Sequence, residues 1–154
     1  MSLVKQVQQY LDLHHPGFKA MEFAESTATS ELAAQALGVE VGQIAKTLVF
    51  KGKMDYVMIV AAGDVKIDHK KLREVVGSKT RMATPDEVLE VTGYPVGGVC
   101  PLNLRQPVRI LLDSSLDRFP VVFAAAGSPN SALPVTLEQL RQMTHGEVVA
   151  VSEI

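Results

Sequence analysis

The 154-residue sequence contains one cysteine, no tryptophan and only 5% aromatic residues. The single cysteine, Cys100, excludes an intrachain disulfide and fits a reducing compartment. Because aromatics are scarce, the core must be built from Val, Leu, Ile, Ala and Met. The longest apolar run, residues 56–62, is too short to span a bilayer, and no basic-then-apolar pattern marks a signal peptide. We therefore expect a cytoplasmic protein without membrane contact.

Spacings typical of metal and cofactor sites are also missing. The four histidines are scattered, and none lies four residues from another on a predicted helix. Gly93, Gly97 and Gly98 do not form a dinucleotide fingerprint, and no G-x-S-x-G nucleophile motif occurs. The sequence therefore predicts neither a metal ion nor a cofactor.

Charge is unevenly distributed along the chain. The net charge of −2 argues against a generally basic, DNA-binding surface. Residues 46–81, however, hold seven Lys, two Arg and four acidic residues, a net charge of +5. We call these residues the basic segment. It is either a footprint for phosphates or a solvated face that keeps the protein in solution.

Length and composition fit one globular domain over residues 1–154, with 47% hydrophobic and 21% charged residues. Helices and strands alternate without a strict βαβ rhythm, which predicts a mixed sheet in an α/β or α+β domain. Capping residues and apolar periodicity predict helices at residues 3–13, 32–37, 69–76, 85–91 and 137–143. Apolar, β-branched runs predict strands at residues 18–23, 44–50, 56–61, 79–82, 108–112, 121–126 and 147–151.

Residues 92–101, the glycine loop, contain three glycines and two prolines but no charge. Glycine lets another molecule approach the main chain closely, and proline fixes the turns around it. Such a loop can hold a ligand with backbone N–H groups, or it can simply connect two elements.

Lys46 lies within an apolar predicted strand, residues 44–50. Burying an ammonium group is costly, so a lysine on such a strand requires a reason. One interpretation is an edge strand from which Lys46 reaches water. The other is an ammonium aimed into a cleft, where it meets a phosphate, a carboxylate or an acyl oxygen.

Cys100 raises a third possibility, because it lies in the glycine loop and a thiol of lowered pKa is a nucleophile. No His or Lys lies near it in the sequence to activate it, and a free cysteine is more often a small buried hydrophobe.

Four segments together resemble the YbaK/EbsC family, relatives of the editing domain inserted in bacterial prolyl-tRNA synthetases. The similarity extends from about Thr29 to the C-terminus. The segments are residues 43–50, 92–99, 112–113 and 126–130.

The resemblance implies a curved mixed sheet flanked by helices and hydrolysis of mischarged aminoacyl-tRNA, bound by its acceptor end. A synthetase is a further expected partner. Lys46 matches the signature lysine of the family and, with Gly98, is expected in catalysis. Gly98 matches the glycine whose main chain lines the pocket, and Gly127 the one that closes it. The resemblance implies substrate binding by Thr47, Gly97, Val99, Cys100, Asp113, Gly127, Ser128 and Asn130.

The sequence departs from the branch of the family that clears cysteinyl-tRNA. That branch would place a Ser and an Asp near Ala125 and Ala132 and an aromatic residue near Thr29. The amino acid removed therefore stays open. So do two other functions: a non-catalytic module that binds aminoacyl-tRNA or an adenylated ligand for a synthetase, and a thiol enzyme that uses Cys100.

Overall fold

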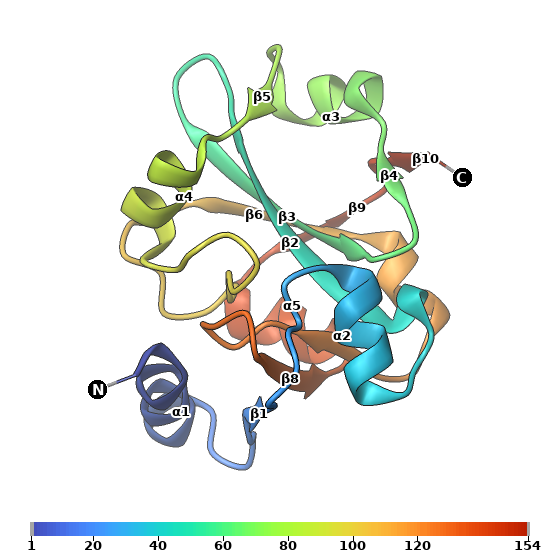
Figure 1. The fold of residues 1–154 in the computed structure, drawn as a ribbon. Coiled ribbons are helices and arrows are strands. Elements are labelled where there is room, and N and C mark those ends of the chain that lie inside the picture. The colour runs from blue at the N-terminus through green and yellow to red at the C-terminus, as the bar shows by residue number, and fades with distance from the viewer. Residues whose placement is uncertain (1, 154) are drawn as a thin grey trace.

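A mixed β-sheet forms the centre of the molecule, seen in a computed structural model that describes residues 2–153 (Figure 1). The strand order is β1-β8-β7-β2-β3-β6-β9, with β5 also paired to β2, and β4 and β10 form a separate pair. The strands are β1 (Met21–Glu22), β2 (Ile44–Lys51), β3 (Tyr56–Ala62), β4 (Lys66–Ile67), β5 (Arg81–Met82), β6 (Arg109–Asp113), β7 (Val122–Ala124), β8 (Ser131–Val135), β9 (Glu147–Val149) and β10 (Ser152–Glu153).

Strand directions confirm the predicted mixed sheet. β2 runs antiparallel to β3 but parallel to β7, and β6 runs parallel to both β3 and β9. The predicted hairpin of β2 and β3 is confirmed, with Lys46 opposite Ala61 and Phe50 opposite Val57. Both strands are central, which explains why their sequences are almost continuously apolar.

Five α-helices lie within residues 2–153, and each begins at a Ser, Thr or Asp whose side chain accepts a hydrogen bond from the first turn. They are α1 (Leu3–His14), α2 (Ser30–Leu37), α3 (His69–Val76), α4 (Pro85–Thr92) and α5 (Leu137–Thr144), with 3-10 turns at Val41–Gln43 and Ser114–Arg118.

The sequence predicts the β7–β8 region less well. The strand expected at residues 121–126 is the shorter β7, and β8 was not expected. Pro134 lies in β8 opposite Phe123 and cannot donate a ladder hydrogen bond. It is tolerated because β1 pairs only with Ser131 and Ala132, which leaves the Pro134 end of β8 as an edge. The strand expected at residues 18–23 shortens to β1.

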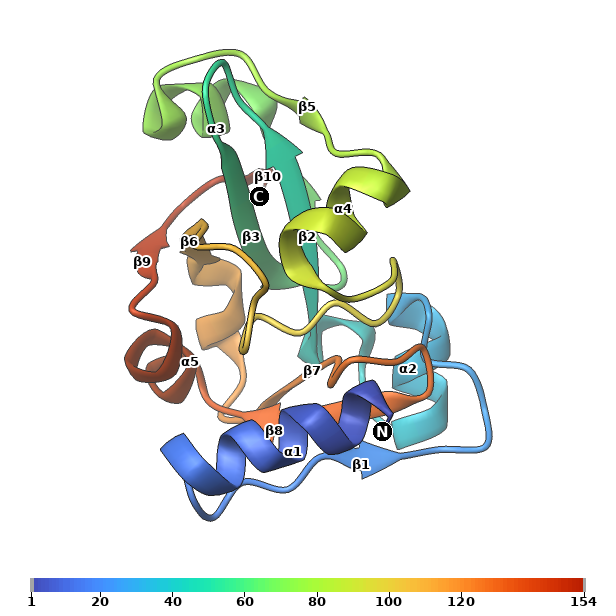
Figure 2. The ribbon, with the colours of Figure 1, turned by 90° about the vertical axis from the view of Figure 1, so that its left-hand side faces the viewer.

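The helices occupy different ends of the sheet (Figures 1 and 2). α3, β4 and β5 lie at one end, and α1, β1 and β8 lie at the other. α2 packs against β2, and α5 packs against β6. Among the described helices the longest has 12 residues, and none has the length and apolar character needed to cross a bilayer.

Candidate active site

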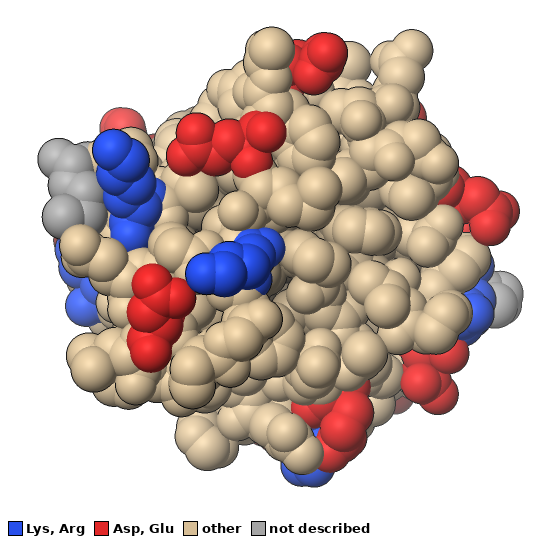
Figure 3. All heavy atoms as spheres, turned by 90° about the horizontal axis from the view of Figure 1, so that it is seen from below, with Lys and Arg blue, Asp and Glu red and all other residues tan. Residues whose placement is uncertain are grey.

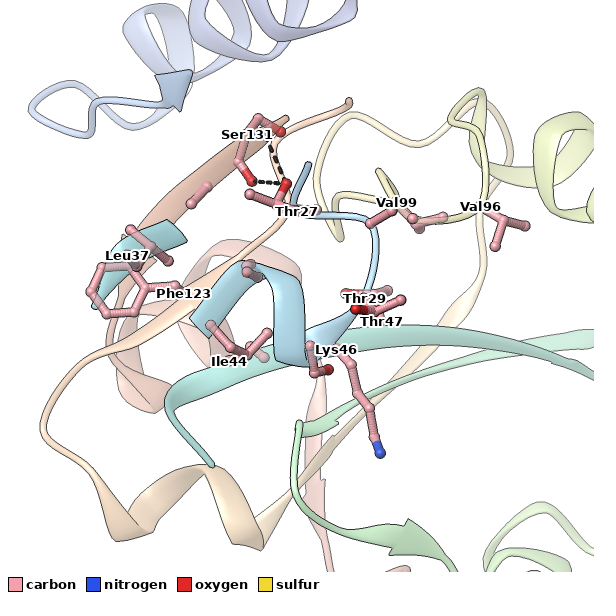
Figure 4. Close-up of a pocket in the computed structure, with 18 of the residues that line it drawn as sticks. Thr27, Thr29, Leu37, Ile44, Lys46, Thr47, Val96, Val99, Phe123 and Ser131 are labelled. Atoms are coloured by element: carbon pink, nitrogen blue, oxygen red, sulfur yellow. Dashed lines mark hydrogen bonds between the residues drawn. The ribbon is translucent and has the colours of Figure 1, made fainter. Parts of the chain in front are cut away.

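A cavity of about 220 Å³ lies where α2, the first half of β2, the glycine loop and the β7–β8 pair meet (Figure 4). Its walls are mainly small apolar side chains, with a few hydroxyl groups and one charged residue, Lys46. The lining comprises Thr27, Ala28, Thr29, Ser30, Ala33, Leu37, Ile44, Ala45, Lys46, Thr47, Leu48, Val96, Gly97, Val99, Phe123, Ala124, Ala125, Ser131 and Ala132.

One wall depends on the start of α2. The Thr29 hydroxyl accepts a hydrogen bond from Leu32 N at 3.2 Å and so begins the helix. A Cβ at Gly63 would lie 2.7 Å from Ser30 Cβ and 2.6 Å from Val41 O. Only glycine fits there, so the turn after β3 fixes the position of the first turn of α2.

Hydrogen bonds join the opposite wall to the segment before α2. Thr27 Oγ1 donates to Ser131 O at 3.1 Å and accepts from Ser131 N at 3.0 Å. The Ser131 hydroxyl accepts from Ala126 N at 2.9 Å and donates to Ser128 O at 2.8 Å. Both side chains are buried and fully engaged in holding the wall together.

Lys46 lines the cavity with its aliphatic stem, but its ammonium donates a hydrogen bond to Val65 O. Burial lowers the pKa of this ammonium, and the carboxylates of Glu31 and Asp64 partly oppose the shift. Figure 4 shows the side chain pointing away from the glycine loop.

This geometry corrects two expectations about Lys46. β2 lies between β3 and β7, so the interpretation as an edge strand is wrong. The expected catalytic role with Gly98 would require the ammonium to face that residue, but it does not: successive side chains of a strand point to opposite faces, and the turn after β3 offers a carbonyl on the Lys46 side.

Thr47 occupies the other face of the strand, beside Thr29 (Figure 4). Its Oγ1 is buried and has no hydrogen-bond partner among residues 2–153. It lines the cavity, as the sequence prediction of a substrate-binding role requires.

The glycine loop reaches the cavity through Val96, Gly97 and Val99. Gly97 has a φ of +89° and lies against Ala28. Gly98 is buried, outside the lining, and its N–H donates to Pro95 O at 3.0 Å, which corrects the expectation that this N–H is free for a ligand. Within residues 2–153 the N–H groups of Gly97 and Val99 donate no hydrogen bond, so they are the available donors.

Cys100 and Asp113 lie away from the cavity. Cys100 is completely buried, and burial raises the pKa of its thiol to about 12, which contradicts the thiol-enzyme hypothesis. Asp113 is also completely buried, and its carboxylate accepts hydrogen bonds from Val151 N at 2.8 Å and Ser115 N at 3.1 Å. Burial raises the pKa of this carboxyl, but the hydrogen bonds outweigh it and hold the pKa below the ordinary value.

The loop at residues 127–130 is likewise outside the lining. Gly127, with a φ of +106°, packs against the backbone of Leu3. Ser128 and Asn130 border a separate open hollow beside α1, and Asn130 Nδ2 donates to Glu25 O at 3.0 Å. The structure therefore assigns these residues to the support of the wall around Thr27 rather than to its surface.

Sequence reasoning found part of the lining by two routes. Lys46, Thr47, Gly97 and Val99 came from the motifs, and all four line the cavity. The three positions at which the sequence departs from the cysteinyl-tRNA branch, Thr29, Ala125 and Ala132, line it as well. No local signal marks the remaining lining residues, such as Ala28, Ala33 and Phe123, because small or apolar residues on separate elements have no common pattern.

Comparison with known proteins identifies similar chains. The sequence profile of a family described as "Aminoacyl-tRNA editing domain" matches residues 24–143. The uncharacterized protein YwhH of Bacillus subtilis is 50% identical over 128 residues, 82% of this chain and 82% of that protein. A "Putative Cys-tRNA(Pro)/Cys-tRNA(Cys) deacylase EbsC" of Enterococcus faecalis is 28% identical over 146 residues, 92% of this chain and 89% of that protein.

Two further similarities concern prolyl-tRNA synthetase. Proline–tRNA ligase of Thermosipho melanesiensis is 37% identical over 89 residues, which are 57% of this chain and only 16% of that longer enzyme. A crystal structure of "a putative trans-editing enzyme for prolyl tRNA synthetase" superposes with a TM-score of 0.93 at 37% identity, covering 100% of this chain and 99% of the other.

Proposed function

This chain belongs to the aminoacyl-tRNA editing domain family, and we propose that it is a trans-editing deacylase that hydrolyses the ester of mischarged tRNA carrying a small amino acid. The cavity carries the proposal, because Lys46 and Thr47 of one strand and the glycine loop, with the free N–H groups of Gly97 and Val99, line the same cavity. The chain spans 99% of the structure described as a trans-editing enzyme, which supports action in trans.

The lining of the cavity supports a small, uncharged amino acid. Ala28, Ala33, Ala125 and Ala132 leave space but offer no polar atom beyond the backbone. Lys46 is the charged residue of the described lining, and its ammonium already donates a hydrogen bond to Val65 O. In this proposal the cavity of about 220 Å³ acts as a size filter that favours small side chains.

The chemistry requires little acid–base machinery, because an aminoacyl ester is already activated. Water, oriented by the 2′-hydroxyl of the terminal ribose, adds to the acyl carbon, and the ribose 3′-oxygen leaves with a proton. Free amino acid and tRNA result. In this proposal the N–H groups of Gly97 and Val99 donate to the developing oxyanion, where fixed donors have the greatest effect. Lys46 exchanges Val65 O for an acyl or phosphate oxygen of the substrate.

The basic segment supports a path for the tRNA backbone. Several of its cations, which lie around α3, β4 and the β2–β3 turn, have side chains without a hydrogen-bond or ion-pair partner among the described residues. They are Lys53, Lys66, Lys70, Arg73 and Lys79. The opposite face, around α1 and β8, carries few cations (Figure 3). We place the tRNA across the α3 end, with affinity that falls as salt rises. In this role the protein acts in the cytoplasm, with an aminoacyl-tRNA synthetase as a further partner.

A panel of mischarged tRNAs tests the function directly. Wild type should release amino acid from at least one small aminoacyl-tRNA over many turnovers, and Lys46→Ala should not. If every ester decays at the rate found in buffer, the deacylase proposal fails. Saturable tRNA binding without turnover would instead support a non-catalytic binding module.

A further inference from the structure

We propose that the Thr47 hydroxyl binds the α-amino group of the aminoacyl ester; the inference rests on the proposed function. Every aminoacyl ester carries this group, and entry into an apolar cavity removes its water. A hydroxyl oxygen is an acceptor for its N–H groups. The residue would thus distinguish aminoacyl esters from other acyl esters, whatever the amino acid.

The first argument is that Thr47 Oγ1 is buried without a partner among the described residues. An unpaired buried hydroxyl destabilises the fold, so valine, which has the same shape, would suit an apolar cavity wall better. A threonine at this place is explained if a bound molecule completes its hydrogen bonding.

The second argument is that the other buried hydroxyls of the cavity are already engaged. Thr27 Oγ1 both donates to and accepts from the backbone of Ser131. The Ser131 hydroxyl donates to Ser128 O and accepts from Ala126 N. The Thr29 hydroxyl, nearer the surface, accepts from Leu32 N as a helix cap. The Ser30 hydroxyl also lines the cavity without a hydrogen-bond partner among the described residues, but its oxygen is not buried. Thr47 Oγ1 is therefore the buried hydroxyl oxygen of the described lining with free hydrogen-bonding capacity.

The third argument is the position of charge. Lys46 and Thr47 are consecutive on β2 and point to opposite sides of the strand (Figure 4). A protonated α-amino group is repelled by the Lys46 ammonium, and the Thr47 side is the uncharged one. Among the described lining residues, the Thr47 side of the strand therefore carries no positive charge that would repel the amino group.

The test compares two substrates on the same enzyme preparations. One is the aminoacyl-tRNA of the panel that wild type hydrolyses fastest. The other is the same tRNA acylated with the matching desamino acid, such as propionate for alanine, which is smaller and therefore fits. The enzymes are wild type, Thr47→Val and Thr47→Ser. Because each variant is measured on both substrates, a partly unfolded preparation affects both rates equally.

We expect Thr47→Val to lower kcat/KM for the aminoacyl-tRNA about 10- to 100-fold and for the desamino substrate less than about threefold. Thr47→Ser should restore most of the loss, and the Tm of Thr47→Val should equal or exceed that of wild type. An equal loss on both substrates, or no loss on either, overturns the inference while leaving the deacylase function intact. Absence of hydrolysis by wild type instead removes the function on which it rests.

Discussion

The Lys46 ammonium donates a hydrogen bond to the backbone carbonyl of Val65, in the turn that follows β3. The turn is fixed by Gly63 N, which donates to Ile44 O at 2.7 Å, and by Arg118 Nη1, which donates to Asp64 Oδ2 at 3.1 Å. The ammonium is thus held at the edge of the cavity by a rigid acceptor. A substrate oxygen must replace that single hydrogen bond rather than break an ion pair, so the exchange costs little.

Lys46→Met should abolish catalysis without unfolding the protein. Methionine keeps the unbranched stem that lines the cavity but removes the charge, so kcat/KM for deacylation should fall about 100- to 1,000-fold. Single-turnover hydrolysis of mischarged tRNA measures the loss. Lys5→Met is the matched control, because Lys5 is an exposed lysine on α1, outside both the cavity and the basic segment. We expect it to retain activity within about twofold. Full activity in Lys46→Met would exclude the assigned role.

Cys100 should be chemically inert in the folded protein. It is completely buried, and its thiol has a pKa raised to about 12, so almost no thiolate exists at neutral pH. Iodoacetamide should leave native protein unmodified for hours and label it rapidly in urea, as mass spectrometry would show. Cys100→Ala should keep deacylation within about threefold and lower stability by about 1 kcal/mol. Rapid labelling of native protein, or an inactive Cys100→Ala, would restore the thiol hypothesis.

Local sequence signals predict the helices and the central hairpin well. Ser2, Asp68, Thr84 and Thr136 cap helices where the sequence places them, because caps and apolar periodicity act within one or two turns. β8 was missed because Pro134 is tolerated only where a neighbouring strand ends, a fact of sheet order that local pattern does not contain.

The site was predicted at the level of segments more than of atoms. The motifs correctly bring β2 and the glycine loop to one cavity. They do not reveal that the Gly98 N–H donates a hydrogen bond to Pro95 O, or that the Lys46 side chain turns toward Val65. Both facts depend on which carbonyl the folded chain places nearby. A motif records that a residue matters and leaves open whether it touches the substrate or supports a neighbour that does.

Gly98→Ala should destabilise the protein and disturb the cavity together. A Cβ at Gly98 would lie 2.7 Å from the carbonyl carbon of Ser128 and 2.8 Å from its Cα, and backbone atoms cannot yield as a flexible side chain does. We expect a loss of about 1–3 kcal/mol, measured by urea denaturation, and weaker deacylation because Gly97 and Val99 shift with the loop. In the control Gly38→Ala, no atom lies within 4 Å of the new Cβ and only the strain of a φ of +71° remains.

That control should lose stability without losing deacylation at temperatures where it is folded. If Gly98→Ala is as stable and active as wild type, the contact between the glycine loop and residues 127–130 does not position the cavity wall.

Asp113→Asn should reduce stability rather than substrate binding. Both carboxylate oxygens of Asp113 accept from backbone N–H groups, Oδ1 from Val151 and Oδ2 from Ser115. An asparagine amide would direct its NH₂ at one of these donors, which costs about 2–3 kcal/mol. Asp117→Asn changes an exposed aspartate in the 3-10 segment that Asp113 caps, and it should change stability by less than about 0.5 kcal/mol.

The pH dependence of the free energy of unfolding tests the structural role of the Asp113 carboxylate. Its pKa in the folded protein lies below the ordinary value of 3.8, so its stabilising contribution is complete above that value and is lost as the pH falls through the folded pKa. The stability difference between wild type and Asp113→Asn should therefore be constant near neutral pH and shrink below about pH 4. Urea denaturation across this range measures it. A variant as stable as wild type at pH 7 but unable to deacylate tRNA would instead return Asp113 to the substrate-binding residues, because only contact with substrate would then account for the loss.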